Sequence, residues 1–159
     1  MTSKAPGQQT VKVQPFAGSP DDLAELAEMA MAEGYRFVVR LVDELTSGAN
    51  RFDREGETLI IASEPTGRLV GVAGRNIDPY AGDPAIGRVR RFYVDPGMRR
   101  QGTGRLLLDQ IVAGAAGHFE ALRVRTANPG AAAFYEVCGF IAGPGPHRGP
   151  ATHRLELGR

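Results

Sequence analysis

The sequence predicts an α+β fold with a central, twisted, mostly antiparallel sheet of about six to seven strands, flanked by four helices. Short apolar runs of strand length recur along the chain, and two of them, 58–62 and 69–73, are separated only by the turn residues 64–68. Such a pair is typical of an antiparallel hairpin. Other segments repeat apolar residues at helical spacing, which indicates helices packed on the sheet.

The first part of the chain predicts a strand followed by two helices. Residues 11–16 have strand character, and Ser19 is placed as the N-cap of a helix that Gly34 ends. A second helix is expected over 38–46, because its apolar residues fall on one stripe. The polar residues 1–10 predict a disordered leader before these elements.

Glycine and proline set the boundaries of the later elements. A chain of this length forms one core, so residues 11–159 are expected to be a single domain. The predicted elements are a strand over 89–94 after an Asp-, Pro- and Gly-rich loop, a helix over 102–116, a strand over 122–125, a helix over 129–137, and strands at 140–141 and 152–157.

Composition restricts the classes of function. The 19 Lys and Arg are nearly balanced by 18 Asp and Glu, so the net charge gives no general attraction for nucleic acid or an anionic membrane. The single cysteine, Cys138, excludes an intramolecular disulfide, and no apolar run approaches the roughly 18 residues of a membrane span. We therefore expect a soluble, cytoplasmic protein in which any anion binding is local.

The glycine-rich loop between the strand 89–94 and the next helix is the strongest functional signal. Gly102 and Gly104 let the backbone turn tightly and approach a ligand, while the N–H groups and the dipole of the first helical turn point to the same place. Arginines at positions 99, 100 and 105 flank the loop. The arrangement is typical of an anion site, although two glycines alone are also consistent with a ligand-free turn.

Two other phosphate-binding patterns do not match this loop. The dinucleotide fingerprint needs a third glycine at the position of Leu107. The ATP-type P-loop needs a lysine after its second glycine, but Gly97-x-x-x-x-Gly102 is followed by Thr103-Gly104. A different kind of phosphate ligand is therefore expected.

Residues 99–104, Arg-Arg-Gln-Gly-Thr-Gly, resemble motif A of the GCN5-related N-acetyltransferase (GNAT) superfamily, which is Arg/Gln-x-x-Gly-x-Gly/Ala at a strand–helix junction. Residues 128–140 are similar to the family's motif B, Asn-x-x-Ala-x-x-Phe-Tyr-x-x-x-Gly-Phe. Two motifs in the right order are much harder to match by chance than one. The resemblance also covers the order of elements over about residues 11–157.

The resemblance implies the GNAT fold, splayed at the strand that ends near Val94, and acetyl-coenzyme A-dependent N-acetyltransferase activity without a metal. Backbone N–H groups of residues 99–104 would hold the cofactor pyrophosphate, and the strand end would pair with the pantetheine as an added strand. Tyr135 matches the residue that faces the thioester sulfur, so it is the implied catalytic residue. The implied cofactor-binding residues are Phe92, Tyr93, Val94, Arg99, Arg100, Gln101, Gly102, Thr103, Gly104, Arg105 and Asn128.

Acetyl transfer to an amine needs a neutral nitrogen, hydrogen-bond donors for the developing oxyanion and a proton for the leaving thiolate. Tyr135 can supply that proton or act only as a hydrogen-bond donor, because proton transfer from a tyrosine to a thiolate is uphill by roughly 2 kcal/mol. A core tyrosine without a chemical role is the alternative. The oxyanion donor is expected to be a backbone N–H near Val94.

No general base stands out in the sequence. Cys138 reads as a small core hydrophobe, so we expect direct attack of the amine in a ternary complex and no covalent acyl-enzyme. The side chains of a suitable type, each of which is more often a surface or loop residue, are Glu57, Asp78, Asp83, His147 and His153.

Arg88, Arg90 and Arg91 crowd the strand before the glycine-rich loop. They either face water or line the acceptor pocket. If one of them points into the pocket, the acceptor carries a carboxylate or phosphate as well as its amine. The expected partners are acetyl-coenzyme A and a primary amine of a small molecule or peptide; nucleic acid and membrane are not expected, and a homodimer is left open.

Two other classes of function remain. A non-catalytic acyl-coenzyme A-binding regulatory (sensor) domain would share the fold and the loop. Tyr135 favours the enzyme, whereas the missing base favours the sensor. A nucleic-acid-binding module ranks third, because the charge is balanced and no stripe of aromatic and basic residues is present.

Overall fold

The structure, a computed structural model, describes residues 10–158. Except for Thr10, the expected leader lies outside these residues. In chain order the elements are β1 (Lys12–Pro15), the 3₁₀ turn η1 (Pro20–Leu23), α1 (Ala24–Ala32), α2 (Phe37–Ser47), β2 (Thr58–Ser63), β3 (Leu69–Ile77), β4 (Ile86–Val94), the 3₁₀ turn η2 (Pro96–Met98), α3 (Thr103–Ala115), β5 (Ala121–Val124), α4 (Pro129–Val137), β6 (Ile141–Ala142) and β7 (His153–Glu156).

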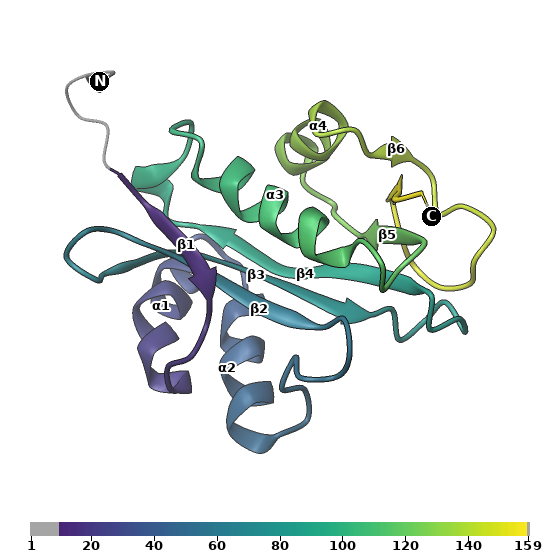
Figure 1. Ribbon diagram of the computed structural model, residues 1–159. Coiled ribbons are helices and arrows are strands. Elements are labelled where there is room, and N and C mark those ends of the chain that lie inside the picture. The colour runs from purple at the N-terminus through teal and green to yellow at the C-terminus, as the bar shows by residue number, and fades with distance from the viewer. Residues whose placement is uncertain (1–9, 159) are drawn as a thin grey trace.

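Within the described residues, the strands form one seven-stranded sheet in the order β1-β2-β3-β4-β5-β7-β6. Neighbouring strands are antiparallel except β4 and β5, which run parallel. A parallel pair needs a crossover connection, and α3 provides it. The predicted mostly antiparallel sheet flanked by four α-helices is confirmed over this part of the chain (Figure 1).

The helices cover both faces of the sheet, with α1 and α2 on one face and α3 and α4 on the other (Figure 1). Beneath α1 and α2 the core includes Leu26 and Leu41, and beneath α3 it includes Leu107 and Ile111, all fully buried. Burying a side chain of this kind contributes about 1.5–3 kcal/mol relative to leaving it exposed. The N-terminus of α3 is thereby fixed just beyond the end of β4. No helix in the described residues has the length and apolar character needed to cross a bilayer.

β3 and β4 are each nine residues long and extend beyond the predicted strands. β3 continues through Arg75 because its buried guanidinium donates to the carbonyls of Gly56 (2.7 Å) and Ile111 (2.6 Å). A polar side chain satisfied in this way can occupy a core-facing strand position. β4 starts at Ile86, inside the segment predicted as a loop.

Candidate functional site

β4 is bent by a bulge at Arg91. This residue has a positive φ of 56°, and the register with β3 shifts beside it, from Gly74 opposite Arg90 to Val72 opposite Tyr93. Two residues of β4 therefore face one residue of β3. Such bulges bend a strand and change the direction in which its end runs.

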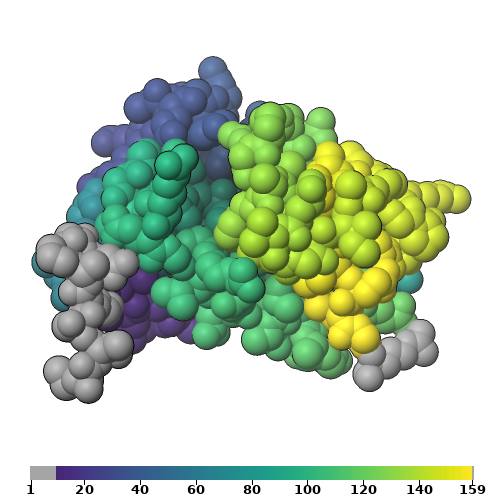
Figure 2. Space-filling view, turned by 90° about the horizontal axis from the view of Figure 1, so that it is seen from above, coloured from purple at the N-terminus to yellow at the C-terminus, as the bar shows by residue number. Residues whose placement is uncertain are grey.

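After the bulge, β4 has no partner strand on its β5 side. The two strands pair only over Ile86–Arg88 and Ala121–Arg123, so the splay that the family resemblance implies is present. On the opposite side Asp95 N–H donates to the Val70 carbonyl (2.8 Å), and the alternation of an antiparallel ladder then turns the N–H of Val94 toward the splayed gap. Figure 2 shows a hollow between the teal segment that follows β4 and the yellow-green α4.

The loop between β4 and α3 presents unpaired backbone donors. Within the described residues, the N–H groups of residues 100–105 find no hydrogen-bond acceptor, and Leu106 N–H is the first that bonds, to the Gly102 carbonyl (3.0 Å). Gly102 takes a φ of 86°, in the left-handed region where an L side chain is strained. A row of free N–H groups at the positive end of a helix dipole is suited to an anion.

Two further features of this loop fit a closely approaching anion. A Cβ on Gly104 would meet Phe134 and Phe92 at 3.6 and 3.7 Å, which is ordinary contact, so the protein's own packing does not require glycine there. Glycine in a helix costs about 0.5–1 kcal/mol relative to alanine, so its presence is consistent with space kept for a ligand. Among the side-chain oxygens and nitrogens of the described residues that are fully shielded from solvent, only Thr103 Oγ1 lacks a hydrogen-bond partner.

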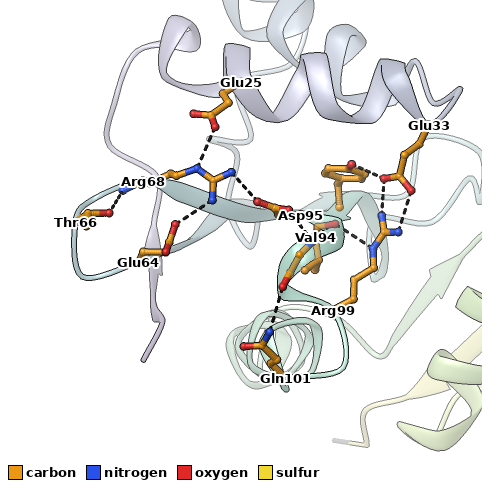
Figure 3. Close-up of polar contacts among 11 residues, drawn as sticks. Glu25, Glu33, Glu64, Thr66, Arg68, Val94, Asp95, Arg99 and Gln101 are labelled. Carbon is orange, nitrogen blue, oxygen red and sulfur yellow. Dashed lines mark hydrogen bonds and ion pairs between the residues drawn. The ribbon is translucent and has the colours of Figure 1, made fainter. Parts of the chain in front are cut away.

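The Arg99 side chain turns away from the loop toward α1 (Figure 3). Its guanidinium donates to both carboxylate oxygens of Glu33 (2.9 and 2.7 Å), and its Nε donates to the Val94 carbonyl (3.2 Å). The same carboxylate accepts the Tyr93 hydroxyl (2.5 Å). The hydrogen bond from Arg99 is the main cause that holds the pKa of Glu33 below its usual value. Arg99 thus ties α1 to the end of β4.

A second charged cluster fixes the exit of β4 (Figure 3). Asp95 accepts the Gly97 N–H (2.8 Å), which caps the turn η2, and also an N–H of Arg68 (2.8 Å). Arg68 further binds Glu64 and, on α1, Glu25. The sequence indicated Asp95 only as the end of the strand and Arg68 only as a turn residue, and it gave no sign of Glu33.

The other two flanking arginines differ from each other. Arg105 forms an exposed pair with Asp109 one turn along α3 (3.2 Å). Arg100 is exposed, adopts a φ of 63° and has no ion pair or hydrogen bond among residues 10–158. Arg100 is therefore free to contact an anion at the loop.

Tyr135 lies beneath the splayed gap. Its ring packs against Phe92, Phe134 and Phe140, with ring centroids 5.3 to 6.1 Å apart. Its exposed fraction is only 4%, yet its hydroxyl has no hydrogen-bond partner among the described residues. Burial raises the pKa of Tyr135, so this hydroxyl is a persistent donor without an acceptor in the protein.

Asn128 has a structural role as the N-cap of α4. Its Oδ1 accepts the N–H groups of Gly130 (2.8 Å) and Ala131 (3.1 Å). Its Nδ2 donates to the Tyr35 hydroxyl (3.0 Å), which joins α4 to the turn between α1 and α2. The contact with cofactor that the resemblance implies for Asn128 stays a prediction.

The five acids and histidines of suitable type are all engaged in contacts within the fold. Glu57 binds Asn76 and a backbone N–H of β3, and Asp78 binds two arginines. Asp83 and His147 lie 3.4 Å apart, and His153 lies 2.8 Å from Glu136 on α4. Within the described residues no group of three or more His, Cys, Asp or Glu is arranged to hold a metal ion.

Cys138 follows α4 and is half-buried beside the aromatic cluster. Burial is the first cause that raises the pKa of its thiol above the ordinary value. A thiol that stays protonated is a poor nucleophile, which agrees with its interpretation as a small core residue.

Residues 55–142, slightly more than half of the chain, match the family of acetyltransferase (GNAT) domains. They contain β2 to β5, α3 and α4, and therefore both the loop and the aromatic cluster. No curated protein sequence matches the chain.

Solved structures with a similar fold include three acetyltransferase-type proteins. A proposed acetyltransferase from Exiguobacterium sp. 255-15 has a TM-score of 0.79 at 24% identity, covering 92% of this chain and 93% of that chain. A GNAT-family acetyltransferase from Staphylococcus aureus Mu50 has a TM-score of 0.73 at 17% identity, covering 93% and 99%. A phosphinothricin acetyltransferase from Sinorhizobium meliloti, solved in complex with AcCoA, has a TM-score of 0.67 at 17% identity, covering 94% and 89%. At these identities the likeness concerns the fold.

Proposed function

The chain belongs to the GNAT acetyltransferase family, and from this premise we propose that it is an N-acetyltransferase that transfers the acetyl group of acetyl-coenzyme A to a primary amine of a small molecule or peptide. The observation that carries the proposal is the splay of β4 from β5. One end of the gap holds the free N–H groups of residues 100–105, and the ring of Tyr135 packs against Phe92, on the part of β4 that has lost its partner strand. Acetyl-coenzyme A carries a complementary group for each: a pyrophosphate for the N–H groups and a thioester sulfur for the tyrosine.

The proposed binding roles follow from the free groups. The N–H groups of residues 100–105 and the exposed Arg100 would hold the pyrophosphate, with Gly104 allowing close approach. The edge of β4 at residues 92–94 would pair with the pantetheine amides, because that edge has lost its partner strand. Arg99 would contribute chiefly by fixing α1 on β4, since Glu33 already occupies its guanidinium.

In the proposed reaction, acetyl-coenzyme A supplies an activated carbonyl carbon. The acceptor nitrogen forms a bond to this carbon as the carbon–sulfur bond breaks, and the proton lost by the amine balances the proton gained by the thiolate. The N–H of Val94 is directed to the gap and would stabilise the oxyanion. Tyr135 would donate to the departing sulfur, and its raised pKa favours a hydrogen-bond donor over a full proton donor.

A sensor domain that binds acyl-coenzyme A without turnover is the second candidate. It is favoured by one observation, namely that the five acids and histidines considered as bases are engaged in contacts within the fold. A neutral amine needs no base before it attacks, and the proton that its nitrogen loses afterwards balances the proton that the thiolate gains, so the enzyme proposal does not depend on any of these five side chains.

A screen of primary amines with acetyl-coenzyme A separates the two candidates. Release of free thiol and formation of the acetylated amine should rise together, in equal amounts, for at least one class of amine. Binding of acetyl-coenzyme A by calorimetry, with no acetylated product from any amine, would favour the sensor. Absence of binding would remove both candidates.

A further inference from the structure

Positive charge is only partly balanced where β4 and β5 still pair. Arg88 and Arg123 are both buried and share one carboxylate oxygen, Oδ2 of Asp78, at 3.2 and 2.9 Å. Arg123 is satisfied further by backbone carbonyls of the loop before β7. One acid therefore serves two arginines, and its carboxylate is fully buried between them.

The next two arginines of β4, Arg90 and Arg91, differ in their contacts. The bulge lets Arg91 reach Glu44 on α2, at 3.0 Å. Arg90, opposite Gly74, is half-buried and has no ion pair or hydrogen bond among residues 10–158. Burial, and after it the charge of Arg91, lower the pKa of Arg90 below its usual value. Its guanidinium is thus partly desolvated and repelled by neighbours of the same charge.

An unpaired, half-buried guanidinium is costly, because arginine is rarely taken from water without a partner. A bound anion would therefore lower the free energy of the Arg90 guanidinium in the folded protein. Arg90 is four residues before Val94, and because one of the four steps is taken up by the bulge at Arg91, the distance along β4 is roughly 10 Å. It lies two residues beyond the last pair of β4 and β5, opposite Gly74 on the face toward α2. The charges of Glu44 and Tyr80 act on its guanidinium as well as those of Arg91 and Arg88.

We propose that Arg90 binds the anionic group, a carboxylate or a phosphate, of the acceptor amine. The inference rests on the proposed acetyl transfer and names the substrate class of that site. A guanidinium donates two parallel hydrogen bonds to either kind of anion, which would orient the acceptor along β4 with its amine toward Val94 and Tyr135. The acceptor class is therefore a primary amine separated by several bonds from an anion.

The probes are ω-amino carboxylates and ω-aminoalkyl phosphonates of increasing chain length, each compared with the ω-amino alcohol of the same length. The wild-type protein should acetylate the anionic amines with a kcat/KM about 10- to 100-fold higher than the neutral ones, mostly through KM. Arg90→Met should remove this preference, because kcat/KM for the anionic amines falls to the value for the amino alcohols. Arg90→Lys should keep part of it, because the charge remains and the paired donors are lost.

The matched control is Arg54→Met, which removes the same charge from the exposed loop before β2, beside Glu55 and the end of α3. It should keep the full preference. Arg90→Met should also be at least as resistant to thermal unfolding as wild type, since it removes an unpaired, desolvated charge. A clear loss of stability would instead assign Arg90 a structural role and overturn the inference.

The outcomes separate this inference from the proposed function. If neutral and anionic amines react equally well in wild type, acetyl transfer stands and the anion site is wrong. If no probe reacts, calorimetry of the same probes on the coenzyme A-loaded protein decides. Anionic probes that bind wild type but not Arg90→Met support the site and overturn acetyl transfer. If the anionic probes bind no more tightly than the amino alcohols, the proposed anion site is wrong as well.

Discussion

Tyr135 combines near-complete burial with a hydroxyl that has no acceptor in the described residues. The surrounding phenylalanine rings fix the ring, and burial keeps the hydroxyl protonated by raising its pKa. A bound thioester sulfur would supply the missing acceptor. We therefore propose that Tyr135 serves both packing and chemistry, and a substitution that retains the ring separates the two.

Tyr135→Phe should lower kcat about 10- to 100-fold, the value of one hydrogen bond to a charged group, and leave the affinity for acetyl-coenzyme A and the stability nearly unchanged. Steady-state kinetics and calorimetry measure the two quantities. Because the pKa of Tyr135 is raised, any alkaline decline of the rate below about pH 10 should appear in both proteins. A rate within about threefold of wild type would leave Tyr135 as a packing residue only.

Glu33 is the residue through which α1 holds Arg99 and Tyr93. Its folded-state pKa is lowered, so its stabilisation is present above the unfolded value near 4.3 and is lost as the pH falls through the folded value. Glu33→Gln should destabilise the protein at neutral pH by up to about 1 kcal/mol, because Arg99 is partly exposed and solvent screens the pair.

Urea unfolding at several pH values tests this prediction. The difference between wild type and Glu33→Gln should shrink toward zero in acid. Asp109→Asn breaks the exposed pair with Arg105 and serves as the control, with an effect of only about 0.3–0.5 kcal/mol. A difference that persists at low pH would show that the ion pair is not the cause.

Among the elements, the junction of β4 and α3 forms the proposed binding site for acetyl-coenzyme A. The bulge at Arg91 and the short ladder to β5 open one edge of β4, and Gly102 turns the chain so that α3 starts with its N–H groups free. The glycines of the loop and the Asp-Pro-Gly stop made this junction predictable from sequence. The bulge was not predictable, because the adjacent Arg90 and Arg91 give no periodic signal for the face on which each one lies.

Gly104→Val should abolish acetyl-coenzyme A binding while the fold persists, because the helix has room for a Cβ but the larger side chain would occupy the place proposed for the phosphate. Gly104→Ala is the matched control. It should bind within a few-fold of wild type, since the family pattern allows alanine, and gain up to about 1 kcal/mol of stability. Calorimetry measures the affinity of each variant for acetyl-coenzyme A, and circular dichroism checks that each variant is folded. Unchanged affinity in Gly104→Val would mean that the phosphate binds elsewhere.

At the scale of the whole molecule, Asp78 joins distant parts of the sheet. It follows β3, binds Arg88 on β4 and Arg123 on β5, and through Arg123 holds the loop before β7. Burial alone would raise the pKa of Asp78, but the hydrogen bonds from Arg123 and the Tyr80 N–H and the charge of Arg88 outweigh it, so the pKa is lowered.

Asp78→Asn should destabilise the protein by about 3–5 kcal/mol, because it leaves two buried arginines without their shared carboxylate. Glu156→Gln, which breaks the pair of a more exposed carboxylate with Arg154, should cost less than about 1 kcal/mol. Chemical unfolding measures the free energy of unfolding of both variants and of wild type. Equal effects of the two variants would mean that the buried cluster is not what holds these loops.

Much of this molecule could be predicted from local sequence signals. The element order, the hairpin of β2 and β3, the loop at 99–104 and the helix beginning at Pro129 all depend on glycine, proline and periodicity. The contact of Glu33 with Arg99 and that of Asp78 with Arg123 join residues far apart in the chain, and no local pattern encodes them. The isolation of Arg90 is harder still, because it depends on which acids the fold places nearby.

We propose that acetyl-coenzyme A lies in the gap where β4 leaves β5. A crystal structure of the protein with acetyl-coenzyme A would test this placement. We expect the pyrophosphate on the N–H groups of residues 100–105, the pantetheine along residues 92–94 of β4, and the sulfur within hydrogen-bond reach of the Tyr135 hydroxyl. A cofactor bound elsewhere, or in the gap with its sulfur turned away from Tyr135 and Val94, would contradict it.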